Sequence, residues 1–403
     1  MGEPLRLRVR ALVGASWAPY ALAGVLLAAD ELILSTGLGH VGPGYGTWAL
    51  DHHAYTDVLK LSGQHYVRPG GVIHPVPYLQ DRIEYPIIIG FLLWLPSWLP
   101  GGPASWLAAA GVLCAAATAG AIALLRRVRP GAAWWVAASP ALLVGAGVNW
   151  DMVGIVLMLA ALVWFVESRW SLSGAATAAG TLTKLFPIVA LPVALAALAR
   201  RARAGDAGPL RRWAGWFAVV GVVVLAPFAL AAPANVWWFV DFNSTRPEKD
   251  SLFGPLLPGP VIDAVSLVVV AAVAIWCARA VWRAADELAG RAVVLGAAAT
   301  LVAWMAVNKI WNPQYVLWVF AACGLAGAPA GAGVALGGVT VADWWYEFVL
   351  RIPSHHASYA AVGVVVTVAR GAVLIWLAAW CLRALAGRVQ PAGTSPMASA
   401  ALR

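Results

Sequence analysis

The chain has 403 residues, of which 62% are hydrophobic and only 11% are charged, and its formal net charge is +9. A mean hydropathy of +0.78 is far above that of soluble globular proteins, so the composition excludes a soluble enzyme and indicates an integral membrane protein. The four cysteines lie in apolar runs without a CxxC spacing, which is not the pattern of a disulfide framework or a thiolate metal site.

Long apolar runs recur along the chain, and a helix needs about 20 residues to cross the hydrocarbon core of a bilayer. The runs predict an all-α polytopic membrane protein with about 12 transmembrane helices. The fifth and sixth helices are expected to be short because TKLFP separates them. The expected helices cover residues 11–35, 104–125, 131–148, 151–166, 171–183, 185–199, 213–232, 259–280, 291–307, 313–326, 331–350 and 359–382.

The segment EYPIIIGFLLWLPSWLP decides the predicted topology. If it lies on the outer face as an interfacial or re-entrant helix, the arginine-rich loops RRVR, RRARAGDAGPLRR and CARAVWRAADELAGR all fall in the cytoplasm with both termini. We therefore expect a single transmembrane domain over residues 1–385, with a long first outer loop and its interfacial helices at 36–103. Residues 386–403 are expected to be a disordered cytoplasmic tail.

The net positive charge is then a signal of topology, and nucleic acid is excluded as a partner. All seven histidines and three of the four lysines lie in predicted outer connections. This asymmetry predicts a functional site on the extracytoplasmic side of the plasma membrane. Membrane lipid is expected to surround the spans. In the first outer loop, YTDVLKL predicts a short amphipathic helix that holds the Asp57 carboxylate near the interface.

Lys184, in TLTKLFP, lies between two half-length helices, at a depth where an ion costs about 2.5 to 3.5 kcal/mol. Such a lysine needs a partner or a water-filled cavity. It is expected either to pair with Asp151 in the turn NWD, which begins at Asn149, or to bind an anionic ligand. The two interpretations are compatible if substrate releases the pair.

Further polar groups border the later helices on the same side. They are Lys309 and Gln314 in VNKIWNPQYVLW, Arg246 in DFNSTRPEKD and Arg351 in VLRIPSHH. Cations grouped in this way could hold a phosphate, lysine as a point charge and arginine by bidentate hydrogen bonding. The adjacent histidine pairs at 52–53 and 355–356 lack an HExxH spacing, so no metal site is expected there.

The order of the motifs resembles a known family. YTDV followed by IEYP, then NWDMVGIVLMLAALVW, GTLTKLFPIVALPVAL, DFNSTRP and NKIWNPQYVLW, is similar to the actinobacterial members of glycosyltransferase family 87, within the GT-C fold. That resemblance extends over most of the chain. It implies an inverting transfer of a hexose, expected to be mannose, from a polyprenyl-phosphate sugar donor to a hydroxyl of a cell-envelope glycolipid or polysaccharide acceptor.

The resemblance also implies site residues. Asp57 matches the catalytic loop acid, Glu84 and Tyr85 lie beside it, and Lys184 and Lys309 lie near the donor phosphate. The remaining polar residues of the helix ends are expected to contact substrate: Asn149, Asp151, Arg246 and Gln314.

This chain has EYPI where many relatives have a Y-P-P run, and it has DHH upstream of the acid. The acceptor contacts therefore stay open, with Asp51 and Asp81 as alternative bases.

A phosphate leaving group needs cations more than it needs a general acid, and one carboxylate suffices as the base. The scheme requires no cofactor, although it does not exclude a divalent metal. Arabinose, glucose or galactosamine are alternatives to mannose. The alternative of another class is a secondary transporter or flippase of a lipid-linked or small polar substrate, which would have pseudo-symmetric halves and ionisable groups near the midplane.

Overall fold

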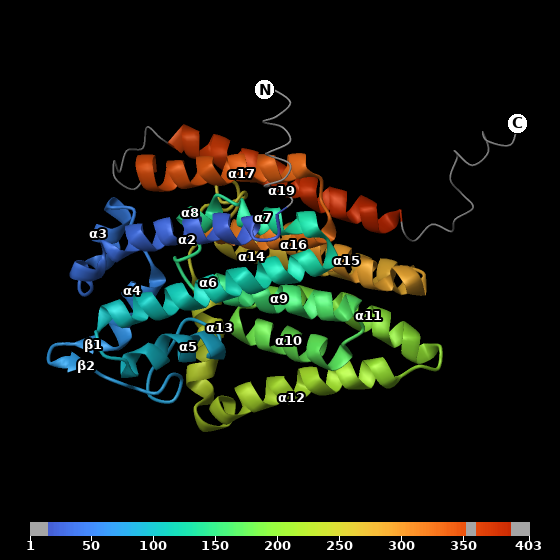
Figure 1. Cartoon of the computed structure of the whole chain (residues 1–403), viewed down its shortest axis with the longest axis horizontal. Coiled ribbons are helices and arrows are strands. Elements are labelled where there is room, and N and C mark those ends of the chain that lie inside the picture. Colours follow the sequence, from blue (N-terminus) through green and yellow to red (C-terminus); the bar gives the residue numbers. More distant parts are fainter. Residues whose placement is uncertain (1–14, 352–359, 388–403) are drawn as a thin grey trace, which may run out of the picture.

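The computed structural model describes residues 15–351 and 360–387, and it is built almost wholly of helices (Figure 1). The predicted all-α class is confirmed. The α-helices are α2 (Ala18–Ser35), α3 (Tyr45–Asp51), α4 (Asp57–His65), α5 (Ile87–Trp94), α6 (Pro103–Val128), α7 (Ala133–Ala137), α8 (Ala141–Val144), α9 (Asp151–Val166), α10 (Trp170–Thr183), α11 (Ala190–Arg203), α12 (Gly208–Ala231), α13 (Pro233–Thr245), α14 (Gly259–Arg283), α15 (Ala289–Val307), α16 (Val316–Ala326), α17 (Ala330–Trp345) and α19 (Ala360–Ala386).

Short elements join these helices. The 3₁₀ turns are η1 (Leu38–His40), η2 (Leu95–Trp98), η3 (Pro130–Ala132), η4 (Phe186–Val189), η5 (Asp286–Leu288) and η6 (Pro313–Tyr315), and η7 (Tyr346–Arg351) is a π-helix. The antiparallel strands β1 (Val67–Arg68) and β2 (Gly71–Val72) form a hairpin within residues 36–103, the segment predicted to be the first outer loop.

Six helices within the described residues are long and apolar enough to cross a membrane. They are Ala18–His40, Pro103–Val128, Gly208–Ala231, Gly259–Arg283, Asp286–Val307 and Ala361–Ala386. The chain is therefore a multi-pass membrane protein. Shorter apolar helices lie between them. The number of crossings and the side of each terminus stay predictions.

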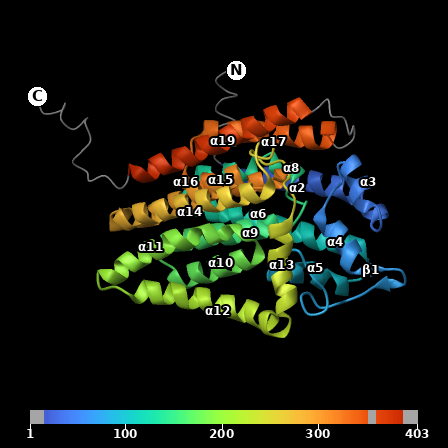
Figure 2. The same cartoon turned by 180° about the vertical axis from the view of Figure 1, so that it is seen from behind.

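The long helices run roughly parallel, with α15 inside the bundle and α12 at its edge (Figures 1 and 2). In the most apolar stretch of the span that contains α15, 83% of the residues are buried inside the protein. In the corresponding stretch of α12 the share is 0%, so α12 faces lipid. α3, α4, α5 and the hairpin gather at one end of the bundle. The turns from α11 to α12 and from α14 to α15 lie at the other end, and α13 runs crosswise to the bundle.

Several expected boundaries are confirmed. α4 begins at Asp57, where Thr56 accepts a hydrogen bond from the backbone N–H of Val58 (3.1 Å) as an N-cap. The predicted break at TKLFP is also present. Lys184 has extended dihedrals (φ −146°, ψ 142°) at the end of α10, and Pro187 lies in the η4 turn that follows.

Two expectations about helices were wrong. Residues 131–148 do not form one helix, because the chain is interrupted between α7 and α8 at Pro140, whose nitrogen cannot donate a helical hydrogen bond. After α8 the chain turns at Gly145 and Gly147. A side chain at Gly147 would meet Leu34 at 2.5 Å. Residues 233–258, where no helix was expected, contain the helix α13, whose run VWWFVDF lacks a clear helical period.

The first outer loop has a core of its own. Buried Val58, Leu61 and Tyr66 pack with Ile83 and the apolar residues of α5 against Trp106 and Trp150 of the bundle. A loop that buries this much apolar surface is a folded part of the bundle end, and it holds its polar residues in fixed places.

Tyr78 fixes the turn that precedes α5. Its hydroxyl donates to the carbonyls of Tyr85 and Pro86, both at 2.8 Å. A Cβ at Gly90 would lie 2.5 Å from the Tyr78 ring, so this position needs glycine. The backbone at Tyr85 and Pro86 is thereby fixed relative to Tyr78. Whether α5 lies in the membrane interface stays a prediction.

The predicted topology can be tested with single cysteines at the two ends of the bundle. The four native cysteines are buried, so they give little background labelling. Ile73→Cys, beside the hairpin, is expected to react with a membrane-impermeant maleimide in intact cells. Ala204→Cys, at the end of α11, is expected to react only after permeabilisation, because its loop carries the arginines. Labelling of both from the same side would contradict the layout.

Candidate active site

A cavity of about 580 Å³ lies at the bundle end where the first outer loop, α13 and the ends of α14 and α15 meet. Eight of the nine predicted site residues line it: Asp57, Glu84, Tyr85, Asn149, Lys184, Arg246, Lys309 and Gln314. The ninth, Asp151, is completely buried and contacts Lys184 behind the cavity wall. Segments far apart in the sequence therefore supply one site.

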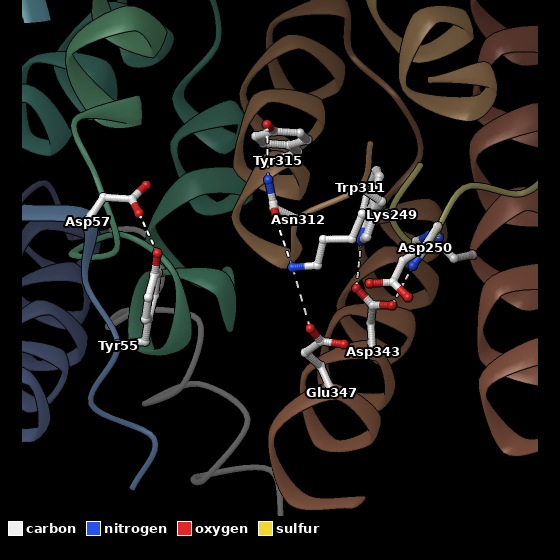
Figure 3. Close-up of polar contacts among 10 residues, drawn as sticks. Tyr55, Asp57, Lys249, Asp250, Trp311, Asn312, Tyr315, Asp343 and Glu347 are labelled. Atoms are coloured by element: carbon white, nitrogen blue, oxygen red, sulfur yellow. Dashed lines mark hydrogen bonds and ion pairs between the residues drawn. The ribbon is translucent and has the colours of Figure 1, made fainter. Parts of the chain in front are cut away.

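The Asp57 carboxylate is oriented by two tyrosines. Tyr55 donates to one oxygen at 2.8 Å and Tyr85 donates to the other at 2.6 Å; Figure 3 shows the first of these bonds. Burial raises the pKa of both tyrosine hydroxyls well above its ordinary value, and the Asp57 charge raises it further. Both tyrosines therefore remain donors, and the carboxylate stays in a single orientation toward the cavity.

The backbone around Asp57 is tied to the turn between α8 and α9. The Asp57 N–H donates to the carbonyl of Val148 at 2.7 Å, and the Thr56 hydroxyl donates to the carbonyl of Gly147 at 2.8 Å. The Gly147 N–H in turn donates to Asp30 of α2 at 2.7 Å. These bonds seat the amino-terminal end of α4 on the bundle, so Asp57 is held at the cavity by main-chain contacts as well as by side chains.

Glu84 is the second carboxyl group of the first outer loop at this cavity. Burial raises the pKa of Glu84, and the nearby Asp57 charge raises it further, while Lys60, His65 and Arg246 oppose the rise. Two neighbouring carboxyl groups in different environments are a common arrangement in sites that transfer protons.

Lys184 and Asp151 form an ion pair, one of the two alternatives that the sequence left open. Lys184 Nζ lies 2.7 Å from Asp151 Oδ1, and it also lies 4.3 Å from the centre of the Tyr85 ring. The Asn149 side chain accepts a hydrogen bond from the Asp151 N–H at 2.9 Å, which holds the start of α9. The lysine therefore has a carboxylate behind it and the cavity in front of it.

Two further lysines at the cavity have carboxylate partners. Lys309 Nζ lies 2.7 Å from Asp263 of α14 and donates to the carbonyl of Ser244 at 2.9 Å. Lys249 Nζ lies 3.5 Å from Glu347 and donates to Asn312 at 3.1 Å (Figure 3).

Lys60 and Arg246 complete the set of cations that line the cavity. The Lys60 ammonium donates to the Tyr55 hydroxyl at 3.3 Å, and the Arg246 guanidinium lies 5.5 Å from the centre of the Phe242 ring. Within residues 15–351 and 360–387, neither cation has a carboxylate within ion-pair distance. These two charges are the ones most available to an anion in the cavity.

Residues 84–307, more than half of the chain, match the model of glycosyltransferase family 87. The chain belongs to glycosyltransferase family 87. The resemblance of the motifs to glycosyltransferase family 87 is confirmed. Membership favours glycosyl transfer over the transporter or flippase alternative.

Two solved structures of ArnT from Cupriavidus metallidurans are similar to this family 87 chain. The one bound to undecaprenyl phosphate is 16% identical, with a TM-score of 0.44 over 93% of this chain and 79% of that one. The apo structure is 17% identical, with a TM-score of 0.40 over 76% and 68%. No curated protein matches the chain.

The two alternative acids of the first outer loop do not line the cavity of this glycosyltransferase. Asp51 is exposed at the end of α3. Asp81 lies 2.6 Å from His65 and so has a structural partner. Asp57 and Glu84 are thus the first-loop acids that face the cavity. His355 and His356 lie outside the described residues, as does the Arg351 side chain.

Sequence reasoning missed several lining residues, among them Tyr55, Lys60, Lys249 and Asp263. Asp263 could have been found, because a lone acid in the apolar run GPVIDAVSLVVV requires a partner at membrane depth. Lys249 lies three residues after Arg246, which was expected to contact substrate. Nothing in the sequence alone tells which of the two is paired.

A buried ion pair supports the cavity from behind. Arg370 of α19 lies 2.5 Å from Asp343 of α17, and Trp311 donates to the same carboxylate at 2.6 Å. Arg370 also donates to the carbonyl of Asp250 and lies 4.4 Å from the Trp311 ring. Figure 3 shows the hydrogen bond from Trp311 to Asp343.

This pair is connected to the lysines through the backbone. The Lys249 N–H donates to the carbonyl of Lys309 at 3.1 Å, and the Trp311 N–H donates to the carbonyl of Lys249 at 2.8 Å. The two segments that carry the lysines therefore form a small parallel bridge. The ion pair contacts both segments, because Arg370 donates to the Asp250 carbonyl and Trp311 donates to Asp343.

Removing one member of this buried pair is expected to destabilise the protein strongly. Arg370→Met leaves Asp343 as a buried charge without its cation, at a cost of about 3 to 5 kcal/mol. Thermal unfolding in detergent measures the loss. Arg127→Met is the matched control, because its pair with Glu167 (2.6 Å) is 43% exposed on the arginine side and contributes at most about 1 kcal/mol. Equal effects of the two substitutions would contradict the assigned role of the buried pair.

Proposed function

We propose that this family 87 enzyme transfers a hexose, mannose, from a polyprenyl-phosphate sugar donor to a hydroxyl of a cell-envelope glycolipid or polysaccharide. The reaction takes place on the outer face of the plasma membrane and inverts the anomeric centre. The observation that carries the proposal is one cavity with an oriented carboxylate and five cations. A base and an anion site together are what transfer from a phosphate donor needs.

In this reaction the acceptor oxygen forms a bond to C1 of the sugar while the bond from C1 to the phosphate oxygen breaks. The acceptor proton passes to the Asp57 carboxylate. The bonding electron pair leaves on the phosphate oxygen, and polyprenyl phosphate is the second product. Tyr55 and Tyr85 occupy one lone pair on each carboxylate oxygen and leave another for the incoming proton.

Arg246 and Lys60 are the proposed contacts of the donor phosphate, since they have no carboxylate partner in the described chain. Lys184, Lys249 and Lys309 add positive potential to the cavity, although each is already offset by a carboxylate. The scheme requires no cofactor. The choice of mannose rests on the resemblance to polyprenyl-phosphate-mannose-dependent members of the family.

Asp57→Asn is expected to lower the turnover number about a hundredfold to ten-thousandfold, because an amide cannot accept the acceptor proton. Membranes supplied with labelled polyprenyl-phosphate mannose and native glycolipid give the rate. Asp51→Asn is the control, since Asp51 is exposed and does not line the cavity. Unchanged turnover in Asp57→Asn would remove this residue as the base and direct attention to Glu84.

Arg246→Gln is expected to raise the KM for the donor about tenfold to a hundredfold, because it removes a charge-assisted bond to phosphate. Inhibition by free polyprenyl phosphate is expected to weaken by a similar factor. Arg82→Gln provides a matched control, as Arg82 is exposed and bonds Asn235 outside the cavity. An unaltered donor KM in Arg246→Gln would be evidence against the proposed phosphate contact.

A further inference from the structure

A second cavity of about 320 Å³ lies against the first. The two share four lining residues: Tyr55, Val144, Val148 and Phe348. Tyr55 is the important one, because its hydroxyl donates to Asp57. A group that passes Tyr55 from the second cavity therefore approaches the proposed base. The first cavity contains the cations expected to bind the donor phosphate. The second cavity, which also borders Tyr55, is therefore available to the other substrate.

The two cavities differ in charge. Five lysine and arginine side chains line the first cavity, whereas no lysine or arginine is among the described residues that line the second. Its polar side chains are Asp30, His52, His53 and the shared Tyr55, and the rest of the wall is aliphatic or aromatic. Asp30 already accepts the Gly147 N–H. Such a lining disfavours an anionic ligand and favours a neutral one that carries hydroxyl groups.

His53 and Trp344 supply the specific contacts. Their rings are 5.7 Å apart at 53°. His53 has a left-handed backbone (φ 60°), and its ring has no hydrogen bond to the described residues. The neighbouring His52 is different, because its Nδ1 already bonds the Trp48 carbonyl at 2.7 Å and its ring stacks on Trp48. His53 therefore keeps one donor and one acceptor for a ligand.

The apolar part of the wall includes Ile33 and Leu34 of α2. Leu34 is buried, but Ile33 is 40% exposed on the outer surface of its helix. This helix is among the six that can cross the membrane. The cavity wall thus continues onto a surface that faces lipid, and an apolar chain attached to the ligand can follow it.

We propose that this second cavity binds the acceptor, and that the acceptor is a neutral hexose ring attached to an apolar chain. The sugar face stacks on Trp344, hydroxyls bond His53, the chain lies along Ile33, and the attacking hydroxyl reaches Asp57 past Tyr55. This inference rests on the proposed glycosyl transfer. It assigns His53, one of the histidines that the reaction scheme left without a role, to acceptor recognition.

The test uses octyl mannoside as the acceptor probe and labelled polyprenyl-phosphate mannose as the donor, with the whole protein in detergent. His53→Gly suits the left-handed backbone and removes the ring, and Trp344→Leu removes the stacking surface. Each is expected to raise the KM for octyl mannoside about tenfold, equivalent to one lost contact. The donor KM and the slow hydrolysis of donor by water are expected to remain unchanged.

Trp98→Leu is the matched control. Trp98 stacks on His74 (4.1 Å, 16°), a tryptophan–histidine pair of the same kind that lines neither cavity. Direct binding of radiolabelled octyl mannoside, measured without donor, separates this inference from the proposed function. Saturable binding that both variants weaken supports the acceptor site even if no sugar is transferred.

Three results would overturn the acceptor site: no saturable binding to the parent protein, an unchanged acceptor KM in both variants, or an equal rise in the donor KM. Failure of the parent protein to transfer or hydrolyse the labelled donor would instead contradict the proposed function. Thermal unfolding of each variant shows whether a loss of binding reflects a loss of folding.

Discussion

The position of Asp57 depends on one set of hydrogen bonds, those that seat the amino-terminal end of α4 on the turn between α8 and α9. The Val148 and Gly147 carbonyls accept from Asp57 and Thr56, and the buried Asp30 of α2 accepts from Gly147. A polar side chain at that depth is costly without a partner. Asp30 obtains its partner from the Gly147 N–H, and the Gly147 carbonyl accepts from Thr56 at the start of α4. The same turn therefore couples the bundle to the first outer loop.

The remaining charges of the site follow the same constraint. In a medium of low dielectric constant, each buried ion needs an opposite charge or a hydrogen bond. Asp151, Asp263 and Glu347 provide this for three lysines at the cavity, and Asp343 provides it for Arg370 behind the cavity. The partners make it possible to keep several cations at one end of a membrane protein. A site so constructed is preorganised, because its charges are in place before substrate arrives.

The two cavities divide the chemistry between them. One contains all five cations together with Asp57 and Glu84, and the other contains Asp30, His52, His53 and Trp344 with an aliphatic wall. Tyr55 belongs to both and bonds the carboxylate on which the proposed reaction depends. The first outer loop, which supplies Tyr55, Asp57 and His53, is held by its own hydrophobic core. The loop is long because it must place several side chains of the two cavities.

The sequence by itself determined the all-α membrane class, a short helix at YTDVLKL, the break at TKLFP, the need of Lys184 for a partner or a cavity, and the family. These follow from apolar length, capping, proline and the cost of a buried ion, which are local or nearly local effects. The roles of the site residues stay predictions.

Only the tertiary structure decided which acids face the cavity, which cations have partners, and that α13 forms. Asp57 lies at the cavity and Asp51 does not, because the neighbouring Thr56 bonds the carbonyls of Gly147 and Val148, about ninety positions away in the chain. No local pattern encodes such a contact.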